Sequence, residues 1–269
     1  MTPFSLPLWS LLEAASVEQA QAPAIIFARR RLSYAALRQQ SLAYAAGLHQ
    51  LGIQRGDCVA IWMNNSPMWV ALVFACARIG AAVMAVNTRF RSAELGDILA
   101  RSGARLLVYE PRSRTIDYTS VLQAVEPACL RDLRHVVAAG EVADVPREVC
   151  GLRVLPAASL SRPDGFAPET GSVNDGCVMF TTSGTTSKPK LVLHVQRSIA
   201  AHAQDTARAL GYTVPGSVIE VVTPLCGVSG FGMPFAAIAA RAPCGLSPAF
   251  DESQVIDSID KDRVTHIHA

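Results

Sequence analysis

Hydrophobic positions between residues 33 and 109 follow a helical period and a strand period in turn. After Ser33, a residue type that caps helices, apolar side chains recur at helical spacing and predict a helix over 33–50. Three later apolar runs have the length of buried strands, which are expected at 58–63, 81–86 and 105–109. The segments between them predict helices that follow the caps Ser66 and Ser92 and end at Gly80 and Gly103. This order predicts right-handed βαβ units, and therefore an α/β fold with a Rossmann-like, mostly parallel sheet flanked by helices.

The remaining sequence gives a less regular pattern. We expect a helix within 111–135, a short strand at 135–138, and irregular surface chain over 140–175, which is rich in Pro, Gly, Ala and Asp. Further helices are predicted at 194–210, 230–241 and 251–262, and further strands at 218–222 and 264–268. The last strand should pair in a sheet and lead onward, although the sequence ends at Ala269.

Composition and charge narrow the class of protein. Half of the 269 residues are hydrophobic and 17% are charged, which is typical of a well-packed globular protein and not of a disordered or fibrous one. A net charge of +2 is too small to indicate a nucleic acid or an anionic membrane as partner. The longest apolar stretch, 69–86, contains Arg78 and Gly80, so we expect a buried helix, a turn and a strand there, and no membrane span.

The cysteines and histidines indicate no metal site. The seven cysteines are dispersed and form no C-x-x-C pair or zinc-type spacing with histidine. An odd number of dispersed cysteines indicates a reducing compartment, and the N-terminus lacks a signal peptide pattern, so we expect a cytoplasmic protein. His266 and His268 face one side of a predicted strand, but no third ligand is visible, and we favour an ordinary strand face over a metal pair.

The clearest chemistry lies in residues 177–194. An apolar run at 177–180 has the length of a buried strand, and six small residues follow it: Thr181, Thr182, Ser183, Gly184, Thr185 and Thr186. After Ser187 come Lys188, Pro189 and Lys190. A strand that ends in a hydroxyl- and glycine-rich loop followed by lysines suits polyphosphate. Gly184 lets the backbone approach closely, N–H and hydroxyl groups donate to phosphate oxygens, and lysine supplies positive charge.

Residues 182–190 resemble the phosphate-loop signature of the adenylate-forming superfamily, which comprises acyl- and aryl-CoA synthetases, luciferases and peptide-synthetase adenylation domains. The family pattern is roughly T-S-G-T-T-G-x-P-K-G, and this chain departs from it at Ser187 and Leu191, where the family usually has glycine. Other stretches resemble family segments in the same order along the chain: 32–37 (L-T-Y-x-E-L), 51–109 (the N-terminal Rossmann-like region), 223–230 (P-L-F-H-x-x-G) and 264–266 (V-T-x). The resemblance is therefore collinear over nearly the whole chain.

The resemblance implies a ligase that joins a small carboxylic acid to CoA in two half-reactions. The carboxylate attacks the α-phosphorus of ATP to give an acyl-adenylate and pyrophosphate, and a thiol, usually CoA, then displaces AMP. The loop would hold the β- and γ-phosphates with Mg²⁺, and Lys190 is preferred over Lys188 as the cation. The implied nucleotide site consists of Thr182, Ser183, Gly184, Thr185, Thr186, Ser187, Lys188, Pro189 and Lys190.

The same resemblance places substrate contacts at Gly227 and Gly230, where Cys226 and Gly227 replace the F-H pair of the family. The family's Y-G-x-T-E segment, its T-G-D aspartate, its hinge and its late lysine have no counterpart here, so no catalytic residue is assigned. We therefore expect the N-terminal portion of a ligase, inactive alone. By resemblance, 51–204 form a Rossmann-like subdomain, while 1–50 and 205–269 form an incomplete second α/β subdomain with an open sheet edge through which two copies could associate.

A non-catalytic nucleotide-binding or interaction module derived from this fold is the alternative. Other nucleotide-binding classes fit less well. A P-loop kinase would need G-x-x-x-x-G-K-[ST], which the sequence lacks, and a dinucleotide dehydrogenase would need G-x-G-x-x-G between an early strand and helix.

Overall fold

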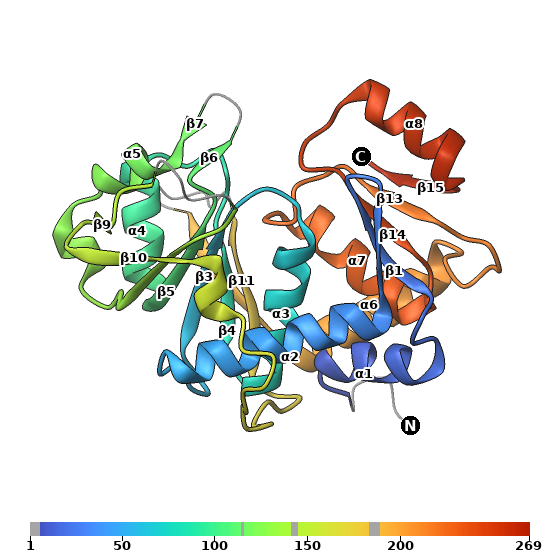
Figure 1. Cartoon of the computed structure of the whole chain (residues 1–269), viewed down its shortest axis with the longest axis horizontal. Helices are drawn as coiled ribbons and strands as arrows, with labels where there is room; N and C mark the ends of the chain where they lie inside the picture. Colours follow the sequence, from blue (N-terminus) through green and yellow to red (C-terminus); the bar gives the residue numbers. More distant parts are fainter. Residues whose placement is uncertain (1–5, 114–115, 141–144, 183–188) are drawn as a thin grey trace.

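The computed structural model describes residues 6–113, 116–140, 145–182 and 189–269. Within these residues two main β-sheets, each flanked by helices, lie side by side (Figure 1). The larger sheet draws its strands from residues 58–195, and the smaller sheet draws its strands from 23–33 and 219–268. The α/β fold class is confirmed, whereas the division of the chain into two subdomains stays a prediction.

The larger sheet is parallel at its centre and antiparallel at both edges. Parallel pairing extends from β11 to β10, and the edge strands β12 and β9 each pair antiparallel with their neighbour. In spatial order the strands are β12 (Lys190–Val195), β11 (Gly176–Thr182), β4 (Ala82–Ala85), β3 (Cys58–Trp62), β5 (Ala104–Tyr109), β8 (His135–Ala138), β10 (Leu152–Pro156) and β9 (Glu148–Val149).

The smaller sheet combines strands from the two ends of the chain. Its strands, in spatial order, are β15 (His266–His268), β13 (Ile219–Val221), β14 (Cys244–Leu246), β1 (Pro23–Phe27) and β2 (Arg30–Ser33). All neighbours pair in parallel except β1 and β2, which form an antiparallel hairpin. A separate two-stranded ribbon is formed by β6 (Arg112–Ser113) and β7 (Ile116–Asp117).

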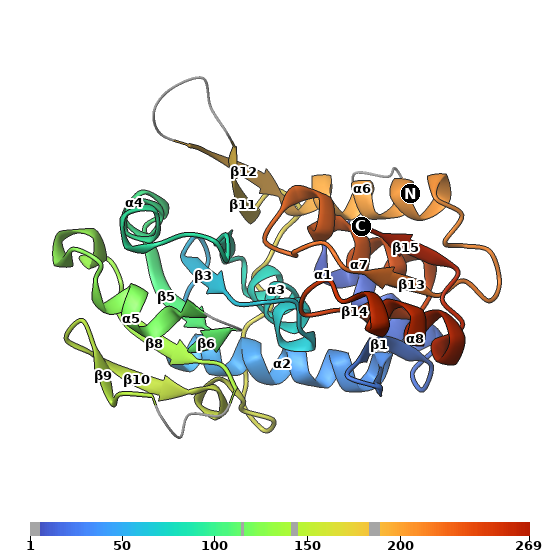
Figure 2. The same cartoon turned by 90° about the horizontal axis from the view of Figure 1, so that it is seen from above.

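Helices cover both sheets and fill the space between them (Figures 1 and 2). The α-helices of the described chain are α1 (Trp9–Glu18), α2 (Tyr34–Gln50), α3 (Pro67–Ile79), α4 (Ser92–Ser102), α5 (Tyr118–Gln123), α6 (Gln196–Ala209), α7 (Val228–Ala240) and α8 (Glu252–Asp262). Short 3-10 turns occupy Pro127–Leu130 and Ala157–Leu160.

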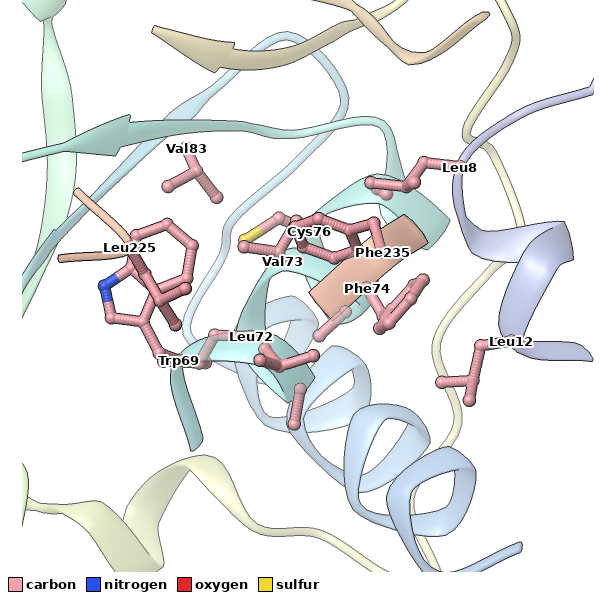
Figure 3. Packing of buried hydrophobic residues seen from close by; sticks show 14 of the residues in the cluster. Leu8, Leu12, Trp69, Leu72, Val73, Phe74, Cys76, Val83, Leu225 and Phe235 are labelled. Atoms are coloured by element: carbon pink, nitrogen blue, oxygen red, sulfur yellow. The ribbon is translucent and has the colours of Figure 1, made fainter. Parts of the chain in front are cut away.

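Helix α3 lies between the two sheets and joins their cores. It is apolar on nearly all sides, as the sequence predicts, and its residues from Trp69 to Ala77 are all buried. Phe74 meets Phe235 of α7 edge to face at 5.3 Å between ring centroids, and Figure 3 shows both rings in the main apolar cluster. Because α7 belongs to the smaller sheet's side, this contact fixes the two halves of the core against each other.

Local start and stop signals predicted several helices correctly. The Ser33 hydroxyl accepts a hydrogen bond from the Ala36 amide, and the Ser66 hydroxyl accepts one from the Trp69 amide, so both serines are N-caps. Gly80 and Gly103 end α3 and α4 with φ of 77° and 62°, in the left-handed region that favours glycine. These confirmed predictions rest on signals contained within a few residues.

Three sequence expectations were wrong. Residues 140–175 are not wholly irregular, because they contain β10, which pairs in parallel with β8. Strand β10 is only partly buried, so its sequence lacks the apolar run by which a buried strand is predicted. The helix expected from 194 begins at Gln196, and residues 190–195 form the edge strand β12. Ser92 was expected to cap α4, but it is the first residue of that helix, and Arg91 is its N-cap. The helix expected within 111–135 is confirmed by α5, and Pro127 begins the 3-10 turn that follows it.

Candidate functional site

The lysine-bearing segment joins β11 to β12 at one edge of the larger sheet. Figure 2 shows these two strands projecting from the body of the molecule. Thr182 and Lys190 face each other at the end of the antiparallel ladder, and both side chains are exposed. The ladder therefore presents a hydroxyl and an ammonium group to solvent at the same end. Pro189 is described as well. The remaining predicted loop residues lie outside the described part of the chain, namely Ser183, Gly184, Thr185, Thr186, Ser187 and Lys188.

Leu191, which departs from the glycine of the resembled signature, has a packing role. Its side chain is partly buried against the apolar cluster to which α4 contributes Leu95, Ile98 and Leu99; we call this the α4 cluster. A glycine at 191 would leave that contact unmade. The residue after Lys190 is thus held by the sheet's own core.

A second contact to this segment comes from Arg101, in the last turn of α4. Its Nη1 donates to the backbone oxygen of Pro189 at 2.7 Å and to Oδ2 of Asp97 at 2.9 Å. Arg101 is not among the site residues predicted from the sequence. No local pattern could have found it, because 88 residues separate it from Pro189.

The two glycines predicted as substrate contacts lie at the start of α7. Gly227 is the N-cap with φ of −103°, and a Cβ built there would meet only the Pro224 oxygen, at 3.5 Å. Gly230 is different, because a Cβ there would lie 2.4 Å from the Pro224 oxygen and 2.7 Å from the Thr223 oxygen. Close packing of α7 against the preceding segment therefore requires glycine at 230, while a contact of either glycine with a substrate stays a prediction.

Asn65 ties this segment to the larger sheet. The Leu225 amide donates to Asn65 Oδ1 at 2.7 Å, and Asn65 Nδ2 donates to the backbone oxygens of Thr223 at 2.9 Å and Ser247 at 3.0 Å. The side chain is buried, with 3% of its surface exposed. In the sequence Asn65 merely precedes the helix cap Ser66, yet in the fold it fixes the approach to α7 from 158 residues away.

Polar groups gather where the parallel strands β3 and β5 end. Glu110 follows β5 and accepts hydrogen bonds from the backbone N of Asn64 at 3.2 Å and from its Nδ2 at 3.0 Å. Burial raises the pKa of the Glu110 carboxyl above its usual range, and the two Asn64 donors oppose that shift. The carboxyl edge of a parallel sheet is where α/β proteins commonly bind ligands. The polar groups of Asn64 and Glu110 lie at this edge of the larger sheet.

Among the described residues, none of the helices combines the length and the apolar character needed to cross a membrane. Likewise, within the described ranges no three His, Cys, Asp or Glu side chains are grouped so that they could hold a metal ion.

Comparison with known proteins yields matches over nearly the whole chain. The AMP-binding enzyme family matches residues 12–269. An indoleacetate–CoA ligase of Aromatoleum aromaticum is 31% identical over 245 residues, which are 90% of this chain and 45% of that protein. The chain spans about half the length of the curated relatives it matches.

Solved structures agree in fold. A putative long-chain-fatty-acid CoA ligase from Rhodopseudomonas palustris has a TM-score of 0.84 at 23% identity, over 98% of this chain and 63% of that one. The anthranilate CoA ligase AuaEII, solved with anthranoyl-AMP, has a TM-score of 0.82 at 22% identity, over 99% of this chain and 51% of that one. At these identities the two structures establish a common fold.

Proposed function

Because this chain belongs to the AMP-binding enzyme family, we propose that it is the N-terminal portion of an ATP-dependent carboxylate–CoA ligase. The observation that carries the proposal is the segment from Thr182 to Lys190, which resembles the family's phosphate-loop signature except at Ser187 and whose two ends pair at an edge of the larger sheet. The relatives support a carboxylic acid as substrate, since they include an indoleacetate–CoA ligase and an enzyme solved with anthranoyl-AMP. The chain's share of their length supports an N-terminal portion.

The chain's own residues would bind and orient the phosphates of ATP. Hydroxyls of Ser183, Thr185 and Thr186 and the amide of Gly184 would donate to the β- and γ-phosphate oxygens, and the Lys190 ammonium would offset their charge. Held in this way, ATP would expose its α-phosphorus to the carboxylate, and the charge of the departing pyrophosphate would be partly offset. In the second half-reaction the CoA thiol displaces AMP.

Mg²⁺ fits the residues present if it enters with ATP. Magnesium is commonly bound through substrate phosphates and few protein carboxylates, so the lack of a metal-binding cluster in the described ranges is compatible with it. The ion would share the charge of the β- and γ-phosphates with Lys190.

The alternative is a non-catalytic nucleotide-binding or interaction module. Such a module would keep the phosphate site, but it would not support adenylation when joined to the remaining part of a ligase. Adenylation activity of such a joined protein therefore distinguishes a ligase portion from a module.

The test is a chimaera in which this chain is followed by the remaining part of the Aromatoleum aromaticum indoleacetate–CoA ligase. We expect indoleacetate-dependent ATP–pyrophosphate exchange that Lys190→Ala lowers by at least about tenfold, because a charge contact to the reacting phosphates is removed. Lys261→Ala is the matched control, since Lys261 pairs with Asp257 in α8. A folded chimaera with no exchange, or with exchange unaffected by Lys190→Ala, would favour the module. The chain alone is expected to show no exchange.

A further inference from the structure

We infer that Arg101 is a positioning residue for Lys190, which holds the β12 end of the phosphate loop against α4. This inference rests on the proposed function, since it assigns Arg101 a role in the same site. Arg101 Nη1 bridges two acceptors, the Pro189 backbone oxygen at 2.7 Å and Asp97 Oδ2 at 2.9 Å. Pro189 is the residue directly before Lys190, so the contact falls on the peptide group that carries the predicted phosphate ligand.

Helix α4 is a firm base for this contact. It begins with the Glu94 carboxylate accepting from the Arg91 backbone amide at 3.1 Å, and Gly103 ends it. Three buried side chains, Leu95, Ile98 and Leu99, fix one face of the helix in the α4 cluster. The backbone from which the Arg101 side chain extends is therefore fixed, and the i, i+4 ion pair with Asp97 limits rotation of the guanidinium.

The other side of the Pro189–Lys190 unit is held as well. Leu191 packs on the α4 cluster, and Lys190 sits in ladder register with Thr182 of β11. Proline has a fixed φ and no N–H, so its carbonyl is the polar backbone group through which a neighbour can hold it. Arg101 uses that group. Together these contacts restrict the peptide plane between Pro189 and Lys190, and with it the direction in which the lysine stem leaves the strand.

Holding the lysine in this way affects ligand binding more than it affects folding. A loop end that already has its bound geometry loses less conformational freedom when phosphate arrives, so affinity rises. Asp97 offsets the charge of Arg101 and leaves the Lys190 ammonium, which is exposed, to meet the phosphates. Arg101 therefore acts through Lys190, and its effect should vanish when Lys190 is absent.

The experiment is a calorimetric titration of the 269-residue chain with magnesium tripolyphosphate, which offers the phosphates without the nucleoside. Arg101→Met keeps the stem and removes the donors; it is expected to weaken binding about fivefold. Arg101→Lys restores a charged donor and should bind within about twofold of the wild type. In a Lys190→Ala background, Arg101→Met should cause no further loss. The unfolding midpoint without ligand should change by less than about 3 °C, since exposed ion pairs contribute little to stability.

Arg105→Met is the matched control for charge. Arg105 lies on β5 and pairs with Asp57 at 2.6 Å, so its loss removes the same charge without touching Pro189. Affinity equal to the wild type in Arg105→Met, with a loss in Arg101→Met, supports positioning. If Arg101→Met binds like the wild type while Lys190→Ala binds more weakly, the inference is overturned and the proposed function stands. An equal loss in both arginine variants also overturns it, because bulk charge then explains the effect. No binding by the wild type overturns both.

Discussion

Gly230→Ala is expected to destabilise the folded chain by about 2 kcal/mol, although alanine is the better helix former. The new Cβ would lie 2.4 Å from the Pro224 oxygen and 2.7 Å from the Thr223 oxygen. Both are backbone atoms, and the Thr223 carbonyl is already held by Asn65, so neither can move aside cheaply. The clash therefore outweighs the gain of about 1 kcal/mol in helix propensity.

Gly232→Ala in the same helix is the matched control. The atom nearest to a Cβ at 232 is the His202 Nε2 at 3.4 Å, the flexible end of a side chain. This variant should be neutral, or more stable by up to about 1 kcal/mol. Urea denaturation followed by circular dichroism measures both. A Gly230→Ala variant as stable as Gly232→Ala would show that α7 does not pack against residues 223–224 as described.

Asn65→Ala is expected to cost about 3 kcal/mol or more of unfolding free energy. The change removes three hydrogen bonds and leaves the oxygens of Thr223 and Ser247 and the amide of Leu225 without that partner. These groups surround Asn65, which is only 3% exposed, so water does not readily take the place of the lost amide. Because Thr223 and Leu225 lead into α7, the variant should also loosen the candidate substrate segment.

Two further variants separate this effect from a general cost of losing an asparagine. Asn65→Asp keeps an oxygen that can accept from the Leu225 amide, but its carboxylate has no donor for the Thr223 and Ser247 oxygens. We therefore expect a loss of unfolding free energy at neutral pH similar to that of Asn65→Ala. Asn174→Ala removes an exposed asparagine that accepts from Arg197, and it should cost less than about 1 kcal/mol. Equal losses at 65 and 174, measured by the same urea denaturation, would contradict the linking role of Asn65.

The parts of the fold that the sequence predicts well are those fixed by neighbours in the chain. Ser33, Ser66 and the glycines at 80 and 103 act within one helical turn, and the helices they bound were confirmed. Strand β12 was missed because a short apolar run such as Leu191–Val195 satisfies a strand and the start of a helix equally. Residues 190–195 form a strand because they pair with β11, and a local sequence pattern does not reveal that pairing.

The site divides in the same way. A short motif is enough to predict the phosphate loop, because the residues proposed to bind phosphate are consecutive. The residues that hold its surroundings are not: Arg101 is 88 residues from Pro189, and Asn65 is 182 residues from Ser247. An arginine and an asparagine on helix ends look ordinary in the sequence, and only the fold shows what they contact.

The most direct test of the phosphate site uses the scarcity of lysine in this chain. Its three lysines are Lys188, Lys190 and Lys261, so an amine-reactive acetylating reagent followed by mass spectrometry can report on each. With MgATP at ten times its dissociation constant, acetylation of Lys190 should slow about tenfold, in proportion to the free fraction of the site. The rate at Lys261, in α8, should stay unchanged. Equal rates at Lys190 with and without saturating MgATP would contradict the assignment of this loop to the phosphates of ATP.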